Sequence, residues 1–349
     1  MIFRQLFDAA SSTYTYLLGC AESGEALLID PVFEQSQRDL ALIRELGLQL
    51  KLVVDTHAHA DHITAAWLLK QKTGCLIASA AVINAQHLDL PLRHGQVFGV
   101  AGVQLEARAT PGHTDGCLSY VLLDQSMVFT GDALLIRGCG RSDFQQGNAA
   151  TLFHSITEQL FSLPDGCVVY PAHDYNGRTQ SSIGEERRYN ARVGGNANET
   201  DFVGYMQAMN LPHPKKIDEA VPANLRSGCP ADGRLPAEPD WAEDLRVTYA
   251  GVPEVGAEWL LQHAPELTLL DVRHPGEVIP GELPAPCANA LAIPLDQLRQ
   301  RQSEVPRDRP VITLCRSGRR SALAAAILQE QEVEQVASLR GGLLALAHG

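Results

Sequence analysis

The sequence predicts two consecutive domains of the α/β class, joined by a proline-rich segment. Its 349 residues exceed the length of one typical domain and are enough for two. Stretches typical of strands alternate with stretches typical of helices in both halves of the chain. Six prolines between positions 212 and 239 interrupt regular structure. We therefore expect a first domain at residues 1–232, a linker at 233–246 and a second domain at 247–349.

Short apolar runs predict strands and a helix in the first domain. Residues 26–30 and 50–55 are apolar runs that end on an aspartate, and they predict buried strands. Residues 63–72, followed closely by Gly74, predict a helix that ends at a glycine. Residues 118–123 and 127–130 predict two strands joined by a turn.

The last hundred residues predict a smaller α/β unit with its own core. Residues 267–271 and 310–314 are typical of buried parallel strands. Residues 321–330 consist mainly of strong helix formers.

Composition and charge exclude several classes of protein. The net charge of −13 argues against a nucleic-acid partner, because such binding depends on clustered lysine and arginine. The amino terminus lacks the features of a secretory signal, and no apolar run approaches the roughly 20 residues of a membrane-spanning helix. The eight cysteines contain no CxxC pair and indicate reduced thiols. We expect a cytoplasmic protein that binds neither nucleic acid nor membrane.

Seven histidines and aspartates form a candidate metal constellation in the first domain. Each group follows an apolar run, and imidazole with carboxylate suits Fe(II), Zn or Mn without any thiolate. Any one of these residues alone would more often be a solvated or structural side chain. The joint pattern indicates a metal site made from His57, His59, Asp61, His62, His113, Asp132 and His173.

The sequence segments around these residues resemble those of a known family. Residues 138–145 (GCGRSDFQ), 171–175 (PAHDY) and 216–224 (KIDEAVPAN) resemble the ethylmalonic-encephalopathy type of persulfide dioxygenase, within the metallo-β-lactamase superfamily. The resemblance runs through residues 1–230 and implies the αβ/βα sandwich of that superfamily. Glyoxalase II, a zinc or mixed-metal thioester hydrolase, has the same order of ligands and remains the alternative.

The resemblance also implies the metal and its ligands. The family binds one Fe(II) per chain, which assigns the ligands to His57, His113 and Asp132 in this sequence. Such a set leaves open positions for a persulfide sulfur and O₂, whereas zinc has no redox chemistry. The ligand types alone do not decide between these metals. The other members of the constellation would orient the ligands through hydrogen bonds: His59, Asp61, His62 and His173.

Glutathione is the co-substrate that the resemblance implies. Its two carboxylates match the fork of a guanidinium group. We expect Arg141 and Tyr175 to contact it, with Arg178 and Arg192 as further candidates that could equally be surface charges.

A cysteine loop carries the chemistry of the second domain. Cys315 follows an apolar strand and precedes the helix at 321–330, with Arg316, Arg319 and Arg320 in the same loop. Backbone N–H groups at a helix amino terminus and neighbouring cations both favour the reactive thiolate. The loop CRSGRRS resembles the rhodanese family, as do several segments between 271 and 345, although Gly281-Glu282-Leu283 replaces the usual Gly-His-Ile.

These observations predict a bifunctional enzyme of sulfur metabolism. The first domain would convert glutathione persulfide, O₂ and water into glutathione and sulfite. The second, a sulfurtransferase, would carry a sulfane sulfur on Cys315 between thiosulfate, sulfite and small thiols. The alternative is a zinc thioester hydrolase with an attached sulfur-carrier domain. The sequence is compatible with a homo-oligomer but does not define one.

Overall fold

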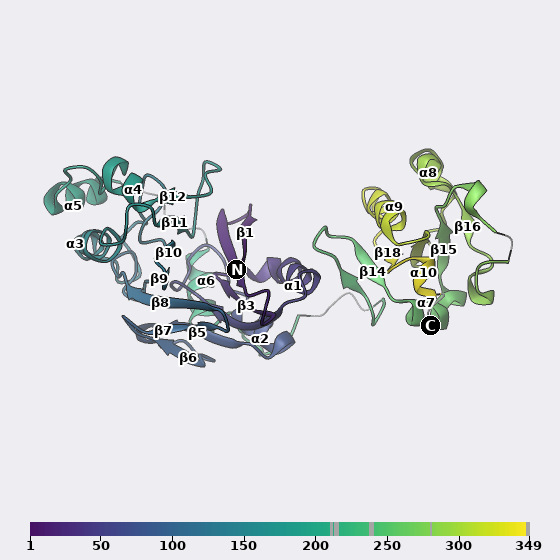
Figure 1. Cartoon of the computed structure of the whole chain (residues 1–349), viewed down its shortest axis with the longest axis horizontal. Coiled ribbons are helices and arrows are strands. Elements are labelled where there is room, and N and C mark those ends of the chain that lie inside the picture. The colour runs from purple at the N-terminus through teal and green to yellow at the C-terminus, as the bar shows by residue number, and fades with distance from the viewer. Residues whose placement is uncertain (210–211, 213–215, 237–240, 280, 347–349) are drawn as a thin grey trace. The chain divides into compact units, whose positions relative to one another are not determined.

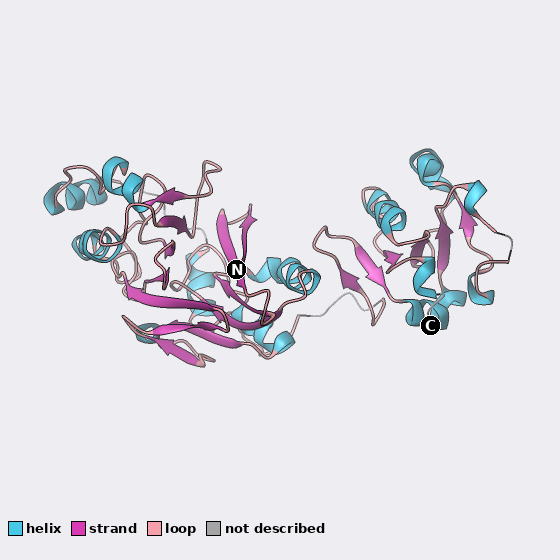
Figure 2. Cartoon of the chain, viewed as in Figure 1, coloured by secondary structure: helices cyan, strands magenta, loops and turns pink. Residues whose placement is uncertain are grey.

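The computed structural model describes residues 1–209, 212, 216–236, 241–279 and 281–346. The chain forms two compact units, of which the first contains Met1–Asp39 and Leu46–Leu235, and the second contains Leu40–Glu45 and Pro236–Gly349. The predicted linker at 233–246 lies partly outside the described residues, and its limits remain a prediction. Figures 1 and 2 show strands flanked by helices in both units.

The first unit contains two mixed six-stranded sheets. The first sheet has, in spatial order, β1 (Ile2–Asp8), β2 (Thr13–Gly19), β3 (Glu25–Ile29), β4 (Gln49–Val54), β5 (Leu76–Ala80) and β6 (Leu90–Leu92). The second has β12 (Ser181–Ser182), β11 (Val168–Pro171), β10 (Met127–Gly131), β9 (Leu118–Leu122), β8 (Val103–Ala109) and β7 (Val97–Val100). Strands β3 to β6 run parallel, as do β10 and β11, so several carboxyl ends share one edge.

The two sheets pack face to face around a large apolar core. The core is rich in aromatic rings, among them Tyr16, Tyr120, Phe129 and Tyr170. Apolar side chains on the other face of the second sheet pack against its helices in a separate cluster. The helices of this unit are α2 (Ala66–Thr73), α3 (Ala149–His154), α4 (Ile183–Tyr189), α5 (Glu199–Ala208) and α6 (Ile217–Asn224), and the unit also contains the first residues of α1 (Ser36–Glu45). This arrangement confirms the predicted αβ/βα sandwich.

The helix predicted at 63–72 begins later than the sequence suggested. Helix α2 starts at Ala66, because Thr64 is held in the preceding loop. The Thr64 hydroxyl donates to Asp55 Oδ1 at 2.9 Å, and its backbone N–H donates to Asn224 Oδ1 at 2.9 Å. The predicted glycine stop is confirmed, since Gly74 adopts a left-handed conformation with φ of 73° and caps the helix.

The second unit is an α/β domain with one mainly parallel sheet. Its spatial order is β13 (Arg246–Val247), β14 (Pro253–Val255), β18 (Val336–Leu339), β17 (Val311–Leu314), β15 (Thr268–Asp271) and β16 (Leu291–Ala292), and only β13 runs antiparallel to its neighbour. Its helices are α7 (Ala257–His263), α8 (Leu295–Arg301), α9 (Arg319–Gln329) and α10 (Leu343–Leu346).

Both faces of this sheet are buried, as a parallel sheet requires. Val311 and Ile312, which are neighbours on β17, belong to different clusters on opposite faces. Helices α8 and α9 contribute to one cluster, and α7 contributes to the other. Cys315 follows directly after β17, at the carboxyl edge of the sheet.

The separate cores predict separate stabilities. Phe129→Ala removes a ring that is 1% exposed, and it should cost the first unit about 3–5 kcal/mol of unfolding free energy. The second unit should keep its stability, because its own residues form its core clusters. Hydrogen exchange in increasing urea, followed on peptides from each unit, measures the unfolding free energy of each unit. Leu123→Ala, at a site 54% exposed, serves as the neutral control. An equal loss in both units would contradict independent cores.

Candidate functional sites

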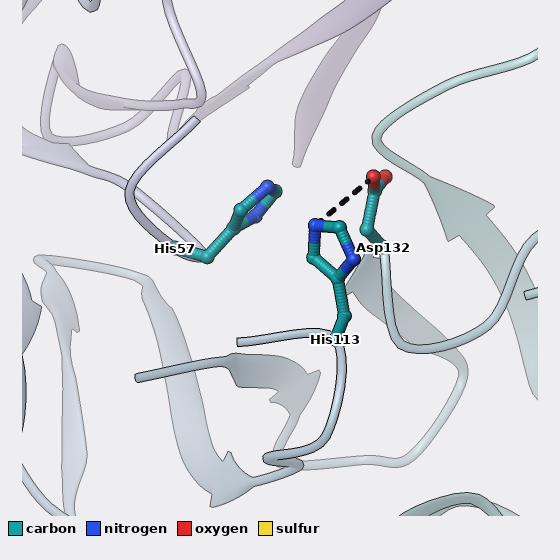
Figure 3. Close-up of side chains that lie close together, drawn as sticks. All are labelled: His57, His113 and Asp132. Carbon is teal, nitrogen blue, oxygen red and sulfur yellow. Dashed lines mark ion pairs between the residues drawn. The ribbon is translucent and has the colours of Figure 1, made fainter. Parts of the chain in front are cut away.

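Three of the predicted ligands converge in the first unit. His57, His113 and Asp132 each offer one ligand atom, and these atoms lie within 4.8 Å of one another. The residues come from three different loops, which follow β4, β8 and β10 (Figure 3). Both imidazoles are buried, and the Asp132 side chain is 14% exposed.

The two imidazoles are oriented by hydrogen bonds behind them. His57 Nδ1 lies 3.0 Å from Thr56 Oγ1, and His113 Nδ1 lies 2.6 Å from the carbonyl oxygen of Arg141. A bonded Nδ1 leaves Nε2 available, which is how metal-binding histidines are commonly arranged. His113 Nε2 points toward Asp132, at 3.5 Å from Oδ2.

The residues present fit a divalent metal ion. Asp132 Oδ1 is buried and accepts no hydrogen bond among the described residues, and His173 Nε2 lies 3.6 Å from it, so a bound cation would compensate an oxygen that is otherwise costly to bury. Burial, together with His59 and His113, lowers the pKa of His57 well below its usual value, so its ring is neutral, as a ligand must be. Gly140 is required beside the site, because a Cβ there would lie 2.8 Å from His113 Nδ1.

The remaining predicted members form a second cluster beside the first. His59, Asp61 and His173 also bring ligand atoms within 4.8 Å of one another. Thr13 joins this cluster, because its hydroxyl lies 3.0 Å from Asp61 Oδ2, 3.3 Å from His62 Nδ1 and 3.4 Å from His173 Nδ1. The structure therefore brings together all seven residues of the constellation. Their individual roles as ligands or orienting groups remain predictions.

Two buried side chains that the sequence did not single out hold the histidine loop. The Asn224 amide donates to the carbonyl oxygens of His59 and His62, at 2.9 Å each. Asp30 Oδ1 lies 3.1 Å from His59 Nε2. Burial alone would lower the pKa of His59, but the charge of Asp30 raises it to about 9. Asn224 belongs to the segment at 216–224 that resembles the family, and this motif could have identified Asn224 from the sequence.

A cavity of about 360 Å³ opens beside the metal ligands. Three of the four residues predicted to bind glutathione line it, namely Arg141, Tyr175 and Arg192. Arg178, whose guanidinium group pairs with Asp174 at 2.7 Å, is not among the residues that line this cavity, and its contact with glutathione remains a prediction. Apolar lining residues that the sequence did not single out complete the wall: Leu135, Phe144 and Met209.

The arginines of this cavity are held by neighbours. Arg141 makes two contacts of 2.6 Å with Asp143, donates to the carbonyl oxygen of Pro212 at 2.7 Å, and lies over the ring of Phe144 at 4.8 Å. Arg192 donates to the carbonyl oxygen of Cys139 and lies 5.6 Å from the ring of Tyr205. Fixed guanidinium groups of this kind favour binding of a carboxylate.

The cysteine loop of the second unit stabilises a thiolate. Cys315 Sγ lies 3.3 Å from Ser321 Oγ, and Gly318 has a φ of 88° that turns the loop into helix α9. Burial alone would raise the pKa of the Cys315 thiol. Hydrogen bonds from the Ser321 hydroxyl and from the backbone N–H groups of Ser321, Ser317 and Gly318 outweigh burial and lower the pKa.

The three loop arginines differ in their surroundings. Arg320 pairs with Glu277 at 2.6 Å, and Arg319 is exposed. The lowered pKa of Cys315 arises mainly from hydrogen bonds of Ser321 and the backbone. The hydrogen bond to Glu277 raises the pKa of Arg320, and the charge of Cys315 helps to raise it, while the catalytic roles of the three arginines remain predictions. Arg316 lines a pocket of about 470 Å³ beside the loop, together with Glu282 and the leucines of α10.

Glu282, which stands where the rhodanese family usually has histidine, forms an ion pair in this structure. Its Oε2 accepts from Arg273 Nη1 at 2.7 Å, and Arg273 also contacts Asp271 through three donated bonds. The glutamate in place of histidine therefore completes an ion-pair network at the pocket wall.

Comparison with known proteins assigns a family to each unit. Residues 9–173 match the family model of the metallo-beta-lactamase superfamily, and residues 256–348 match that of the rhodanese-like domain. Human "Persulfide dioxygenase ETHE1, mitochondrial" is 53% identical over 229 residues, which cover 65% of this chain and 89% of the human protein. The crystal structure of ETHE1 from Myxococcus xanthus is 52% identical with a TM-score of 0.64, and covers 65% of this chain and 100% of that one.

A more distant relative represents the alternative activity. Hydroxyacylglutathione hydrolase of Brucella ovis is 31% identical over 225 residues, which cover 63% of this chain and 84% of the hydrolase. The identity to the persulfide dioxygenases is much higher over a similar length.

The fold and the histidine–aspartate set place the first unit in the metallo-β-lactamase superfamily and the second among rhodanese-like domains. Within that superfamily, the chain belongs to the family of persulfide dioxygenase ETHE1 and carries the rhodanese-like domain after it. Among the described residues, no helix has the length and apolar character needed to cross a bilayer.

The environment of Cys315 predicts the pH dependence of its alkylation. Thiolate forms as pH rises through the pKa, so the iodoacetamide reaction at Cys315 should have its midpoint below the ordinary value of 9.0. Cys139 should stay unreactive in the same range, because burial raises its pKa to about 11. Peptide mass mapping across a pH series measures each site. Ser321→Ala should shift the Cys315 midpoint upward, and an unchanged midpoint would contradict the role of Ser321.

Proposed function

We propose that the first domain oxidises glutathione persulfide with O₂ at a single Fe(II) bound by His57, His113 and Asp132. The observation that carries this proposal is the convergence of two buried imidazoles and one carboxylate beside a cavity, where one carboxylate oxygen accepts no hydrogen bond among the described residues. The overall reaction consumes one persulfide, one O₂ and one water, and yields glutathione, sulfite and two protons. The iron, when bound, supplies the redox chemistry that O₂ requires.

The cavity supplies binding and orientation of the thiol. Arg141 and Arg192, which line the cavity, would receive the carboxylates of glutathione, and the exposed Tyr175 would contact it as well. Phe144 and Met209 add apolar surface that excludes water from the reacting sulfur. Held in this way, the persulfide sulfur would face the three ligands.

The second domain is proposed to transfer a sulfane sulfur. The Cys315 thiolate attacks the outer sulfur of thiosulfate, a persulfide forms on Cys315, and sulfite leaves. A glutathione thiolate then attacks that outer sulfur and leaves with it, which restores the Cys315 thiolate. Support comes from the hydrogen bonds that lower the pKa of Cys315. Arg316 at the adjacent pocket offers a cation for the anionic substrates.

A zinc thioester hydrolase is the second candidate function. It is favoured by the second cluster of His59, Asp61 and His173, which could hold another metal, and by the similarity to hydroxyacylglutathione hydrolase. The metal content and the requirement for O₂ distinguish the two functions. A redox-inactive zinc pair would hydrolyse a glutathione thioester without consuming O₂.

The metal site should be separable from the cysteine site. His113→Ala should reduce bound iron from about one per chain to near zero and abolish persulfide-dependent O₂ uptake, because it removes one of three protein ligands. Sulfur transfer from thiosulfate should persist. Iron analysis of anaerobically purified protein and an oxygen electrode measure these effects, with the exposed His154→Ala as the matched control. Two zinc ions per wild-type chain, or thioester hydrolysis without O₂ uptake, would refute the proposal.

A substitution of Cys315 tests sulfur transfer in the second domain. Cys315→Ser should abolish sulfur transfer and leave persulfide-dependent O₂ uptake within a few-fold of wild type, because the two units have separate cores. Sulfite release from thiosulfate and O₂ uptake are the two measurements. Cys287→Ala, which alters a buried thiol away from the loop, is the control and should retain both activities. Loss of O₂ uptake in Cys315→Ser would show that the sites are not independent.

A further inference from the structure

Asp30 and Thr56 form a buried hydrogen-bonded pair directly behind the metal ligand His57. Asp30 follows β3 and is 1% exposed, and Thr56 follows β4 and is also 1% exposed. The Thr56 backbone N–H donates to Asp30 Oδ1 at 2.7 Å, and the Thr56 hydroxyl donates to Asp30 Oδ2 at 2.8 Å. The same hydroxyl oxygen lies 3.0 Å from His57 Nδ1. The two residues thus connect the ends of neighbouring parallel strands to one imidazole.

The direction of these bonds fixes the protonation pattern of the imidazole. A threonine hydroxyl has one hydrogen, and an acceptor-only carboxylate takes it. The Thr56 oxygen must then accept from its other neighbour, so His57 carries its proton on Nδ1. His57 Nε2 is left without a hydrogen and is available as a ligand atom.

Asp30 pays a conformational cost to be placed there. Its φ is 51°, in the left-handed region that residues other than glycine seldom adopt. In this conformation both carboxylate oxygens contact Thr56, while Asp30 Oδ1 also lies 3.1 Å from His59 Nε2. A buried residue kept in such a conformation next to a site indicates a functional constraint.

Thr56 also contacts the loop that carries a second ligand. A Cβ added at Gly131 would lie 2.8 Å from Thr56 Oγ1 and 2.9 Å from Thr56 Cβ, so the two residues are in close contact. Gly131 has a φ of 54° and immediately precedes Asp132. One threonine therefore touches the loops of both His57 and Asp132, which come from opposite sheets.

We propose that Thr56, oriented by Asp30, is a positioning residue that holds the His57 ring with Nε2 presented to the metal and sets the spacing between His57 and Asp132. This inference rests on the proposed metal site and adds two residues that do not themselves bind the metal. Valine has the shape of threonine and would keep the backbone bond to Asp30. The hydroxyl group is the part that orients the ring.

The test compares two substitutions of Thr56 in the full-length chain. Thr56→Val should weaken Co(II) and Fe(II) binding by about 10- to 100-fold, the usual effect of losing a group that orients a metal-binding histidine. Thr56→Ser should stay within about threefold of wild type, because it keeps the hydroxyl. Anaerobic metal titration, with the absorption spectrum of bound Co(II), measures binding without any enzyme turnover. The unfolding midpoint of the metal-free protein should be lower for Thr56→Val than for Thr56→Ser, because valine leaves buried Asp30 Oδ2 without its hydrogen bond.

A matched control separates positioning from general stability. Thr15→Val also removes a buried hydroxyl beside Asp30, since Thr15 Oγ1 donates to the Asp30 carbonyl oxygen at 2.8 Å. It leaves the bonds from Thr56 to Asp30 and His57 intact, so metal affinity should remain within about threefold of wild type.

Several results would overturn the inference. Wild-type affinity in Thr56→Val would show that the hydroxyl does not orient His57. Equal losses in Thr56→Val and Thr56→Ser, accompanied by equally lowered unfolding midpoints, would show a purely structural role. A wild-type chain that binds neither Co(II) nor Fe(II) would overturn both this inference and the proposed function. Intact metal binding with the predicted order of variants, but no O₂ uptake, would overturn only the proposed function.

Discussion

The packing of the two sheets in the first unit determines where its chemistry can occur. Two buried tyrosines, one from each sheet, form hydrogen bonds across this interface. Tyr16 of the first sheet donates to the carbonyl oxygen of Pro171 at 2.5 Å, and Tyr120 of the second sheet donates to that of Asp55 at 2.6 Å. Each tyrosine fixes the last residues of a strand in the opposite sheet, just before a loop of the metal site. The spacing between ligands from different sheets therefore depends on this core.

The two sites of the chain illustrate different ways of using buried polar groups. The metal site gathers residues from distant loops, and a buried carboxylate oxygen that accepts no hydrogen bond is stable there when a cation compensates its charge. The cysteine site lies within one loop, where backbone N–H groups and a serine hydroxyl compensate a single negative charge. The first requires tertiary packing, whereas the second is formed largely by a strand, a turn and a helix that are consecutive in sequence.

Much of this organisation was predictable, and the departures have physical causes. Apolar runs located the strands, and Gly74 located the end of α2, because these signals are local. The start of α2 was wrong by three residues because Thr64 bonds to Asp55, nine residues earlier in the chain. Arg178 was one of two further candidates for glutathione contact that could equally be surface charges. The turn that pairs it with Asp174 was not revealed by the sequence pattern.

The sequence by itself determined the chemical groups: the histidines and aspartates after apolar strands, and the cysteine before a helix. It did so because metal ligands and nucleophiles need particular side chains. Short sequence motifs contain these residue types, so they can be recognised without the structure. The tertiary structure alone decided that Thr56 and Asp30 lie behind His57 and that one oxygen of Asp132 accepts no hydrogen bond among the described residues. It also decided which arginines line a cavity. Those facts depend on how strand ends that are far apart in the chain pack together, and no local pattern specifies that geometry.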